Sequence, residues 1–575
     1  MKLLPPLAGV LVACAAALWG AGAPAPARSL FAEGVEALLL VGDAGSPAAD
    51  EPLLRALAAE AARDPERTLV VHLGDNLYPN GLPAEGDPRR KEGERRLAAL
   101  ADAGYLEKTE PYTVPVGQCH RCHTPIEPYL SWQWFVKMAP LAAPAIEAAR
   151  KGQVKFYPAR YRKVYLNWLE NIRDWCISRQ LWWGHRIPVW YRDGETAVSL
   201  EPPAGEGWRQ DEDVLDTWFS SWLWPFAILG WPEETDDLKR YYPNSLMVTG
   251  ADILFFWVAR MVMAGLEFRG EIPFQHVYFT SILRDAQGRK MSKSLGNSPD
   301  PIEMMERYGA DAVRFSLIYL TPTGQDLLFD EKRLETGKFF ANKIWNAARL
   351  VQMRLGDEDL SKLRESSLRL TLADRWILSR YANAVKNVTR NLKTYRFNEA
   401  ANALYQFAWA EYCDWYLEMA KPRWADDADA ADRTAARWVS WKVLDGILRL
   451  LHPFMPFVSE EIWQALPHEG ESLAMASWPR AKKAWFDAEA ERQVQFLQEL
   501  VVAVRNLRAE NKVAPGRPVA VVVRGEPAQL DLVERLAEQI RPLARIESRS
   551  LARDGARPRV AASAVVQGAE VFLPL

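Results

Sequence analysis

The residue types best suited to chemistry stand close together in one short basic segment. Lys290 and Lys293 are three positions apart, and Ser292 and Ser294 stand on either side of the second lysine. Ammonium groups act as compact charges against a polyanion, and hydroxyl groups add hydrogen-bond donors. Glycines before and after the segment let the backbone turn, so the pattern is typical of a loop that closes over a triphosphate. A solvated basic turn would also explain these residues taken alone.

Two apolar segments lead up to this loop and have to position it. Residues 246–257 begin as a buried strand, turn at Gly250 and continue as a helix, with Asp252 near the helix start. A carboxylate there is favourably placed against the positive end of the helix dipole. Residues 273–279 predict the next strand, which leads into the lysine loop.

Residues 282–297 as a whole resemble the signature loop of class I aminoacyl-tRNA synthetases. Further segments in the same order resemble the valine–tRNA ligase branch of that family, namely residues 115–122, 167–188, 213–221, 246–257 and 309–315. The resemblance implies a partial Rossmann-like α/β nucleotide-binding domain followed by an all-α anticodon-binding bundle. It also implies ATP-dependent activation of valine to valyl-adenylate and transfer of valine to tRNA(Val).

The resemblance assigns roles to residues near the loop. Lys290 and Lys293 would neutralise the phosphates during catalysis, and Mg²⁺ would accompany the ATP. Gly250 and Asp252 would hold the ribose, and the backbone ahead of the loop would read the adenine. The full set expected to contact ATP is Gly250, Asp252, His276, Val277, Lys290, Met291, Ser292, Lys293 and Ser294.

Trp218, Ile253 and Trp257 match the positions that line the amino acid pocket in this branch. Ile253 and Trp257 are four positions apart, so a helix would present them on one face. Two indole rings and a branched aliphatic side chain make a small apolar slot that excludes isoleucine by size but cannot strongly reject threonine. Each tryptophan taken alone would be explained as a core residue.

Cys119 and Cys122 have the spacing of a zinc knuckle. Structural zinc requires four ligands. The adjacent His120 and His123 are poorly placed to complete a tetrahedron, and residues 191–209 contain no second cysteine pair. Zinc is therefore left open as a cofactor.

The first hundred residues have a different character. Residues 1–27 are typical of a secretory signal or lipoprotein-like segment, although an apolar N-terminus is the simpler alternative. Two short apolar runs follow, each ending in Gly-Asp, around an alanine-rich stretch, which predicts a β-α-β unit. This part resembles metallophosphoesterases, and the resemblance implies Asp43, Asp75 and Tyr78 as metal ligands. Ordinary strand-end turns would explain it as well, and the expected downstream histidines are not in the sequence.

Length and composition limit the number of domains and the class of protein. A chain of 575 residues predicts three or four domains. Apolar content of 49% and charged content of 25% are ordinary for a globular protein, which argues against a disordered chain. The net charge of −3 means that a tRNA-binding surface must be local. Five cysteines with one Cys-x-x-Cys pair do not make a disulfide framework.

These patterns divide the chain. The expected parts are a signal-like segment at 1–27, a metallophosphoesterase-like fragment at 28–100, the tail of an editing insertion at 104–165, the second half of the catalytic domain at 166–340, a helical anticodon-binding domain at 341–485, and a C-terminal helix with small β segments at 486–575.

Helical periodicity supports the all-α part. An apolar stripe comprises Ile377, Tyr381, Val385, Val388 and Leu392, and a further helix is expected over residues 436–451. Candidate tRNA contacts are Arg505, Arg508, Asn511 and Lys512, with a solvated helix face as the alternative. Short β segments are expected at residues 519–523 and 569–573.

The sequence contains no His-x-Gly-His motif, with which the resembled family stabilises the α-phosphate. We therefore expect this chain alone to be inactive or nearly so. A tRNA-binding fragment without catalysis is the second interpretation, and a secreted metallophosphoesterase is the third. The resemblance implies a cytoplasmic monomer with no membrane partner, which conflicts with the signal-like N-terminus.

Overall fold

A computed structural model describes residues 131–292, 295–356, 360–514, 516–553 and 558–574, with short stretches at 37–41, 68–72, 117–119 and 124–126 and isolated residues between 91 and 102. The chain divides into two compact units, Met1–Leu130 and Ser131–Leu575. Across the described stretches, no helix combines the length and the apolar character needed to span a membrane.

The described residues of the first unit include a parallel strand pair. β1 (Ala37–Val41) pairs with β2 (Thr68–His72) in parallel, which confirms the two strands expected here. The suggested metal ligands Asp43, Asp75 and Tyr78 lie outside the described residues. Their role stays a prediction.

The second unit contains a three-stranded parallel sheet in the order β11-β12-β4. Its strands are β4 (Lys155–Tyr157), β11 (Asn244–Gly250) and β12 (Phe274–Thr280), so both strands expected around residues 246 and 273 are confirmed. Val277 and Phe279 on β12 are two positions apart and both buried, so one face of the sheet is covered, whereas His276 and Tyr278 on the other face are half-buried. The pairing runs from Asn244 opposite Phe274 to Gly250 opposite Thr280, so β11 and β12 end at the same edge.

Helices pack around this sheet. α4 (Met138–Arg150) contacts both α5 (Arg160–Glu170) and α9 (Ala259–Arg269). Short helices follow at α6 (Thr217–Ser221), α7 (Trp224–Ala227), α8 (Asp236–Tyr241), α10 (Pro301–Tyr308) and α11 (Ala310–Leu320). Small antiparallel pairings join β3 (Phe135–Val136) to β5 (Trp175–Cys176), β6 (Ser178–Arg179) to β10 (Val214–Leu215), and β7 (Val189–Arg192) to both β8 (Glu195–Val198) and β9 (Arg209–Gln210).

The helix after β11 does not begin as a regular α-helix. A 3₁₀ turn, η1 (Ala251–Ile253), is followed by a π-helical turn, η2 (Leu254–Val258), in which the Ala259 N–H bonds to the Leu254 carbonyl. The regular α-helix assumed for Ile253 and Trp257 is therefore wrong, because a 3₁₀ turn and a π turn take its place.

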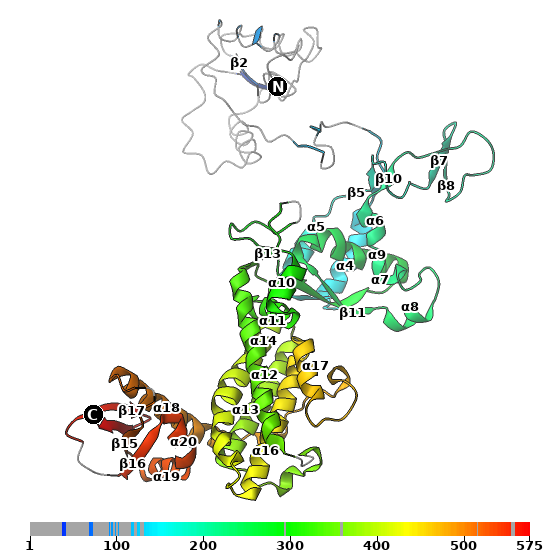
Figure 1. Cartoon of the computed structure of the whole chain (residues 1–575). Helices are drawn as coiled ribbons and strands as arrows, with labels where there is room; N and C mark the ends of the chain where they lie inside the picture. Colours follow the sequence, from blue (N-terminus) through cyan, green and yellow to red (C-terminus); the bar gives the residue numbers. More distant parts are fainter. Residues whose placement is uncertain are drawn as a thin grey trace. The chain divides into compact units, whose positions relative to one another are not determined.

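The all-α part is a bundle around one large core (Figure 1). Its helices are α12 (Glu335–Leu355), α13 (Leu372–Lys393), α14 (Phe397–Gln406), the π-helical η6 (Phe407–Tyr416), α15 (Leu417–Ala420), η7 (Lys421–Trp424), α16 (Ala430–Leu451), α17 (Pro456–Gln464) and α18 (Ala488–Glu510). The stripe from Ile377 to Val388 is buried, as expected, and Leu392 at its end is half-buried. α16 begins six residues earlier than expected because the Asp429 carboxylate accepts a hydrogen bond from the Asp432 N–H and caps it.

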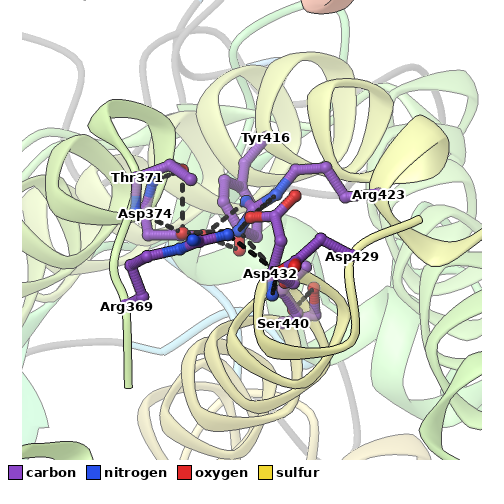
Figure 2. A network of polar contacts seen from close by, with 9 residues as sticks. Arg369, Thr371, Asp374, Tyr416, Arg423, Asp429, Asp432 and Ser440 are labelled. Carbon is purple, nitrogen blue, oxygen red and sulfur yellow. Dashed lines mark hydrogen bonds and ion pairs between the residues drawn. The ribbon is translucent and has the colours of Figure 1, made fainter. Parts of the chain in front are cut away.

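A buried ion-pair network connects four elements of the bundle, α13, η6, η7 and α16 (Figure 2). The Asp374 carboxylate, near the start of α13, accepts bonds from the Tyr416 hydroxyl at 2.8 Å and from both terminal nitrogens of Arg423 at 2.8 Å. Arg423 also donates to Asp432 on α16 at 2.8 Å. Asp374 and Arg423 are almost fully buried, and the shared bonds compensate for the desolvation of their charges.

The C-terminal part is a small four-stranded sheet in the order β16-β15-β18-β17. Its elements are β15 (Val519–Arg524), α19 (Pro527–Arg535), α20 (Ala537–Ala544), β16 (Ile546–Ala552), β17 (Ala561–Val566) and β18 (Ala569–Pro574). The two expected β segments are confirmed as β15 and β18. α18 contacts α13 in the bundle and β17 in the sheet, so one helix connects the two parts.

Candidate nucleotide and amino acid site

The common end of β11 and β12 brings two of the expected ATP-binding residues together. Asp252 follows β11, and Lys290 lies in the loop that follows β12. The Lys290 ammonium group lies 2.5 Å from the Asp252 carboxylate, with both side chains about half exposed. Carboxyl ends of parallel strands are where open α/β sheets bind ligands. Two groups separated by 38 residues therefore meet where a nucleotide would bind.

Glycine is required at position 250 because of the nearby Asp252 side chain, and not because of its backbone conformation. Its φ of −73° is accessible to any residue. A Cβ atom built at Gly250 would lie 2.5 Å from an Asp252 carboxylate oxygen. A side chain at position 250 would therefore displace the Asp252 carboxylate.

The lysine loop begins as a tight hairpin. β13 (Leu283–Arg284) pairs in parallel with β14 (Leu327–Leu328), and Arg284 forms an antiparallel bridge to Lys290. The Asp285 N–H bonds to the Arg289 carbonyl at 2.9 Å, and Gly288 adopts a left-handed φ of +77°. The position of Lys290 is thus fixed by main-chain hydrogen bonds. Lys293 and Ser294 lie outside the described residues.

Asp285 and Asn297 connect the two ends of this loop. The Asp285 carboxylate accepts bonds from the Asn297 side chain at 2.9 Å and from the Arg289 backbone N–H at 2.8 Å. The Asn297 side-chain carbonyl accepts a bond from the Ser292 N–H at 2.9 Å. The hydrogen bond from Asn297, followed by those from Arg289, lowers the pKa of Asp285 to about 2. Asp285 and Asn297 were not predicted from the sequence, although both lie within the loop segment 282–297.

His276 and Val277 are not brought to the same edge. His276 pairs with Leu246, four residues before the end of β12 at Thr280, which places it roughly 13 Å along the strand. The His276 ring lies 3.1 Å from the Tyr157 hydroxyl, and burial together with the nearby Lys155 lowers its pKa. Val277 is fully buried. Neither residue lies beside Asp252 or Lys290. Both are close to the loop in sequence, but the rest of β12 separates them from the carboxyl end of the sheet.

The expected amino acid pocket is built from α6 and η2, which contact each other. The Trp218 ring on α6 stacks on Phe256 of η2 with ring centroids 5.9 Å apart. The Trp257 indole N–H donates to the Ser221 carbonyl at the end of α6, at 3.0 Å. Trp218 and Trp257 thus come from two elements that hold each other in place. Ile253 ends η1 and is half-buried.

A buried charge cluster supports Trp218 and was missed in the sequence. The Asp216 carboxylate caps α6 through the Trp218 N–H at 3.1 Å and accepts bonds from Trp175 at 3.0 Å and Arg179 at 2.6 Å. The Arg260 guanidinium lies 3.5 Å from the centroid of the Trp175 ring. Burial lowers the pKa of Arg260 to about 10, opposed by Asp216. In the sequence, the position of Asp216 directly before Thr217 and Trp218 is typical of a helix N-cap and could have indicated this role.

The zinc candidate is described only in part. Gln118 pairs with Pro125 in an antiparallel bridge, and the Cys119 N–H bonds to the Thr124 carbonyl at 2.9 Å, so the described residues 117–119 and 124–126 run side by side. Cys119 is a free thiol, whereas Cys122 lies outside the described residues. The described residues include no group of three or more His, Cys, Asp or Glu side chains suited to a metal.

Two of the four candidate tRNA contacts, Arg505 and Arg508 on α18, also bond to the backbone of the protein. Arg508 is buried and donates to the carbonyls of Ala544 and Arg517 at 3.0 and 2.7 Å. Arg505 donates twice to the Leu543 carbonyl, at 2.9 and 2.7 Å. The bonds to Leu543 and Ala544 satisfy carbonyl groups in the last turn of α20, where the helix itself supplies no donor.

Family models account for most of the second unit. Residues 94–203 and 203–330 match tRNA synthetases class I (I, L, M and V), and residues 374–523 match the anticodon-binding domain of tRNA ligase. The chain contains a class I tRNA synthetase domain and a tRNA ligase anticodon-binding domain. The class I fold and the helical anticodon-binding domain expected from the sequence are thereby confirmed.

Curated relatives and solved structures agree with these domains. The chain is 50% identical over 517 residues to the valine–tRNA ligase of Carboxydothermus hydrogenoformans, covering 88% of this chain and 58% of that protein. It is 47% identical over 504 residues to that of Thermotoga maritima, covering 86% and 57%. The chain thus spans less than three fifths of the length of these relatives. Mycobacterium tuberculosis methionyl-tRNA synthetase in complex with methionyl-adenylate has the same fold, with a TM-score of 0.50, 18% identity, and coverage of 74% of this chain and 93% of that one.

Proposed function

We propose that this chain serves valine–tRNA ligation: the ATP-dependent formation of valyl-adenylate and the transfer of valine to tRNA(Val). The observation that carries the proposal is the meeting of Asp252 and Lys290 at the shared end of β11 and β12. This cation and carboxylate are suited to the phosphate and ribose ends of one nucleotide. The high identity to valine–tRNA ligases supports valine as the amino acid.

The proposed roles follow from this placement. Lys290, with Lys293, neutralises the phosphates as pyrophosphate leaves, and Asp252 accepts hydrogen bonds from the ribose hydroxyls. Trp218, Ile253 and Trp257 form an apolar slot for the valine side chain. Mg²⁺ enters with the triphosphate rather than through a protein cage, as is usual for nucleotide-bound magnesium.

The proposed partners are valine, ATP and tRNA(Val), with the chain acting as a monomer in the cytoplasm. The helical anticodon-binding domain supports tRNA as the macromolecular partner. The further proposal of a metallophosphoesterase-like front at residues 28–100 is supported by the parallel pair β1–β2 alone. Metal-dependent phosphatase activity of the full chain would test that part separately.

Valine-dependent ATP–pyrophosphate exchange on the purified full chain tests the ligase proposal. We expect exchange that requires valine and is lost in Lys290→Ala and Lys293→Ala, and retained in Gln287→Ala, a matched change in the same loop. Its rate is expected to be low, because the sequence has no His-x-Gly-His motif. Exchange that is indifferent to valine would overturn the proposal.

A second candidate function is tRNA binding without catalysis. The absence of a His-x-Gly-His motif from the sequence favours it. Without that motif, the lysine loop alone would have to stabilise the phosphates in the transition state. Measurable binding of tRNA(Val) together with no exchange above the Lys290→Ala background would select this alternative.

A further inference from the structure

Arg260 carries a buried positive charge that packing alone does not explain. It is the second residue of α9, and its side chain is only 9% exposed. Its Nε and Nη1 atoms have no hydrogen-bond partner among the residues that the structure describes. Burying a charged group with unbonded donors costs free energy. A methionine would fill a similar space without this cost, so the arginine needs another reason.

Neutralisation of Asp216 does not supply that reason, because Arg179 already serves this purpose. The Arg179 guanidinium donates to the Asp216 Oδ2 atom at 2.6 Å and to two backbone carbonyls at 3.0 and 2.8 Å. The Trp175 indole N–H donates to the same Oδ2 atom at 3.0 Å. The Arg260 Nη1 atom lies 4.0 Å from Oδ2, which is an ion pair without a hydrogen bond. Asp216 is therefore neutralised and hydrogen-bonded without Arg260.

Arg260 instead contacts the two groups that hold Trp218. One is Asp216, whose Oδ1 atom accepts a bond from the Trp218 N–H at 3.1 Å and caps α6. The other is Phe256 of η2, whose ring stacks on the Trp218 ring with centroids 5.9 Å apart. The Phe256 centroid lies 5.9 Å from the Arg260 guanidinium carbon. The backbone and the ring of Trp218 are thus both held by groups next to Arg260.

The surroundings of Arg260 are tightly connected. Its guanidinium carbon lies 3.5 Å from the centroid of the Trp175 ring, and stacking on an aromatic face suits this planar group. Phe219 and Trp222, in and directly after α6, contact Trp175 with ring centroids 5.7 and 5.6 Å apart. Because Trp175 also bonds to Asp216, a displacement of Arg260 would be transmitted to the start of α6.

We propose that Arg260 is a positioning residue of the amino acid pocket, which holds Trp218 against η2 and thereby excludes side chains larger than valine. The inference rests on the proposed function, because it takes Trp218 as a wall of the valine pocket. Selection by size requires a wall that does not yield to one extra methylene group, whereas affinity for the smaller ligand tolerates a softer wall. Arg260 therefore affects the preference for valine over isoleucine more than the affinity for valine.

Calorimetric titration of the full chain with non-hydrolysable valyl- and isoleucyl-adenylate analogues tests the inference. The wild-type chain is expected to bind the valyl analogue roughly ten- to hundredfold more tightly than the isoleucyl analogue. Arg260→Met should reduce this ratio at least about fivefold, because a wall that can move admits the extra methylene group. A merely structural role would not change the ratio, since a smaller folded fraction affects both analogues equally.

Arg269→Met is the matched control. It removes an arginine at the other end of α9 that pairs with Glu234, and it should leave the ratio unchanged. Arg260→Lys is a second variant, which keeps the charge beside Asp216 but loses the planar stack on Trp175. Its ratio should fall by about two- to threefold.

The result for Arg260→Met decides if circular dichroism shows that this variant is folded, and the result for Arg260→Lys decides if it is not. A wild-type ratio in the deciding variant would overturn the inference, and so would an equal fall in Arg269→Met.

The wild-type titrations separate this inference from the proposed function. A chain that binds the valyl analogue with a preference insensitive to Arg260 would leave the valine pocket standing and remove the role of Arg260. A wild-type chain that binds neither analogue would contradict the proposed function and, with it, the inference.

Discussion

The Lys290 ammonium group contacts the Asp252 carboxylate at 2.5 Å, although the two residues follow different strands. Both side chains are about half exposed, so the pair contributes little to folding, typically below about 1 kcal/mol. Its importance lies in binding, because each partner is proposed to contact a different end of the nucleotide.

Replacing Asp252 should separate stability from ligand binding. We expect Asp252→Asn to change the free energy of unfolding by less than about 1 kcal/mol, since the pair is exposed. The affinity for a non-hydrolysable ATP analogue should fall roughly tenfold through the loss of one charge-assisted hydrogen bond. Calorimetric titration measures this change. Glu170→Gln, which breaks an exposed pair with Arg150, is the control, and an equal loss there would contradict the assigned role.

Asn297 should control the order of the lysine loop. Asn297→Ala removes the bonds to Asp285 and to the Ser292 N–H, so we expect tryptic cleavage after Arg289 and Lys290 to become several times faster. Gln287→Ala is a matched loop control that should leave cleavage unchanged. Similar cleavage rates in both variants would show that Asn297 does not hold the loop.

The same contacts predict a response to acid. The pKa of Asp285 in the folded chain is lowered to about 2, below the value of about 3.9 for an unperturbed aspartate. The stabilisation is therefore complete above roughly pH 4 and is lost as the pH falls toward 2. Proteolysis by pepsin across this range should become faster in the wild-type loop, while Asn297→Ala should show a smaller change. A pH-independent difference between the two proteins would contradict the titration of Asp285.

Asp374 should be the most sensitive position in the helical domain. Asp374→Asn leaves the buried Arg423 without its bidentate carboxylate, and loss of one partner of a buried pair costs about 3 kcal/mol or more. Denaturant unfolding followed by circular dichroism measures this loss. Asp427→Asn, an exposed change on the nearby loop, should have almost no effect. A loss below about 1 kcal/mol would mean that Arg423 is fully compensated by Asp432.

Trp218 should matter for binding of the amino acid. Its ring stacks on Phe256, and its backbone N–H is held by Asp216. Trp218→Ala should weaken binding of a valyl-adenylate analogue roughly tenfold or more, because a large apolar wall is removed. Trp132→Ala, which removes an almost fully exposed ring, is the control. Equal affinity of both variants would place the valine pocket elsewhere.

The sequence predicted the elements better than the contacts between them. β11, β12 and the α13 stripe were predictable because continuous or periodic apolar residues determine burial over short distances. Asp374 and Arg423 are 49 residues apart, and no local pattern relates them. His276 was placed near the nucleotide because it precedes the loop in sequence, but four residues of extended strand separate it from the edge.

The π-helical turn η2 sets how far α9 is rotated about its axis relative to the end of β11. An α-helix gains one residue in such a turn, which rotates everything before it by roughly 100° relative to everything after it. Asp252 precedes this turn and stays attached to the end of β11, so removing one residue from Leu254–Val258 would restore regular winding and rotate α9 instead. Arg260, the second residue of α9, would then turn away from the Trp175 ring, without a change in either residue.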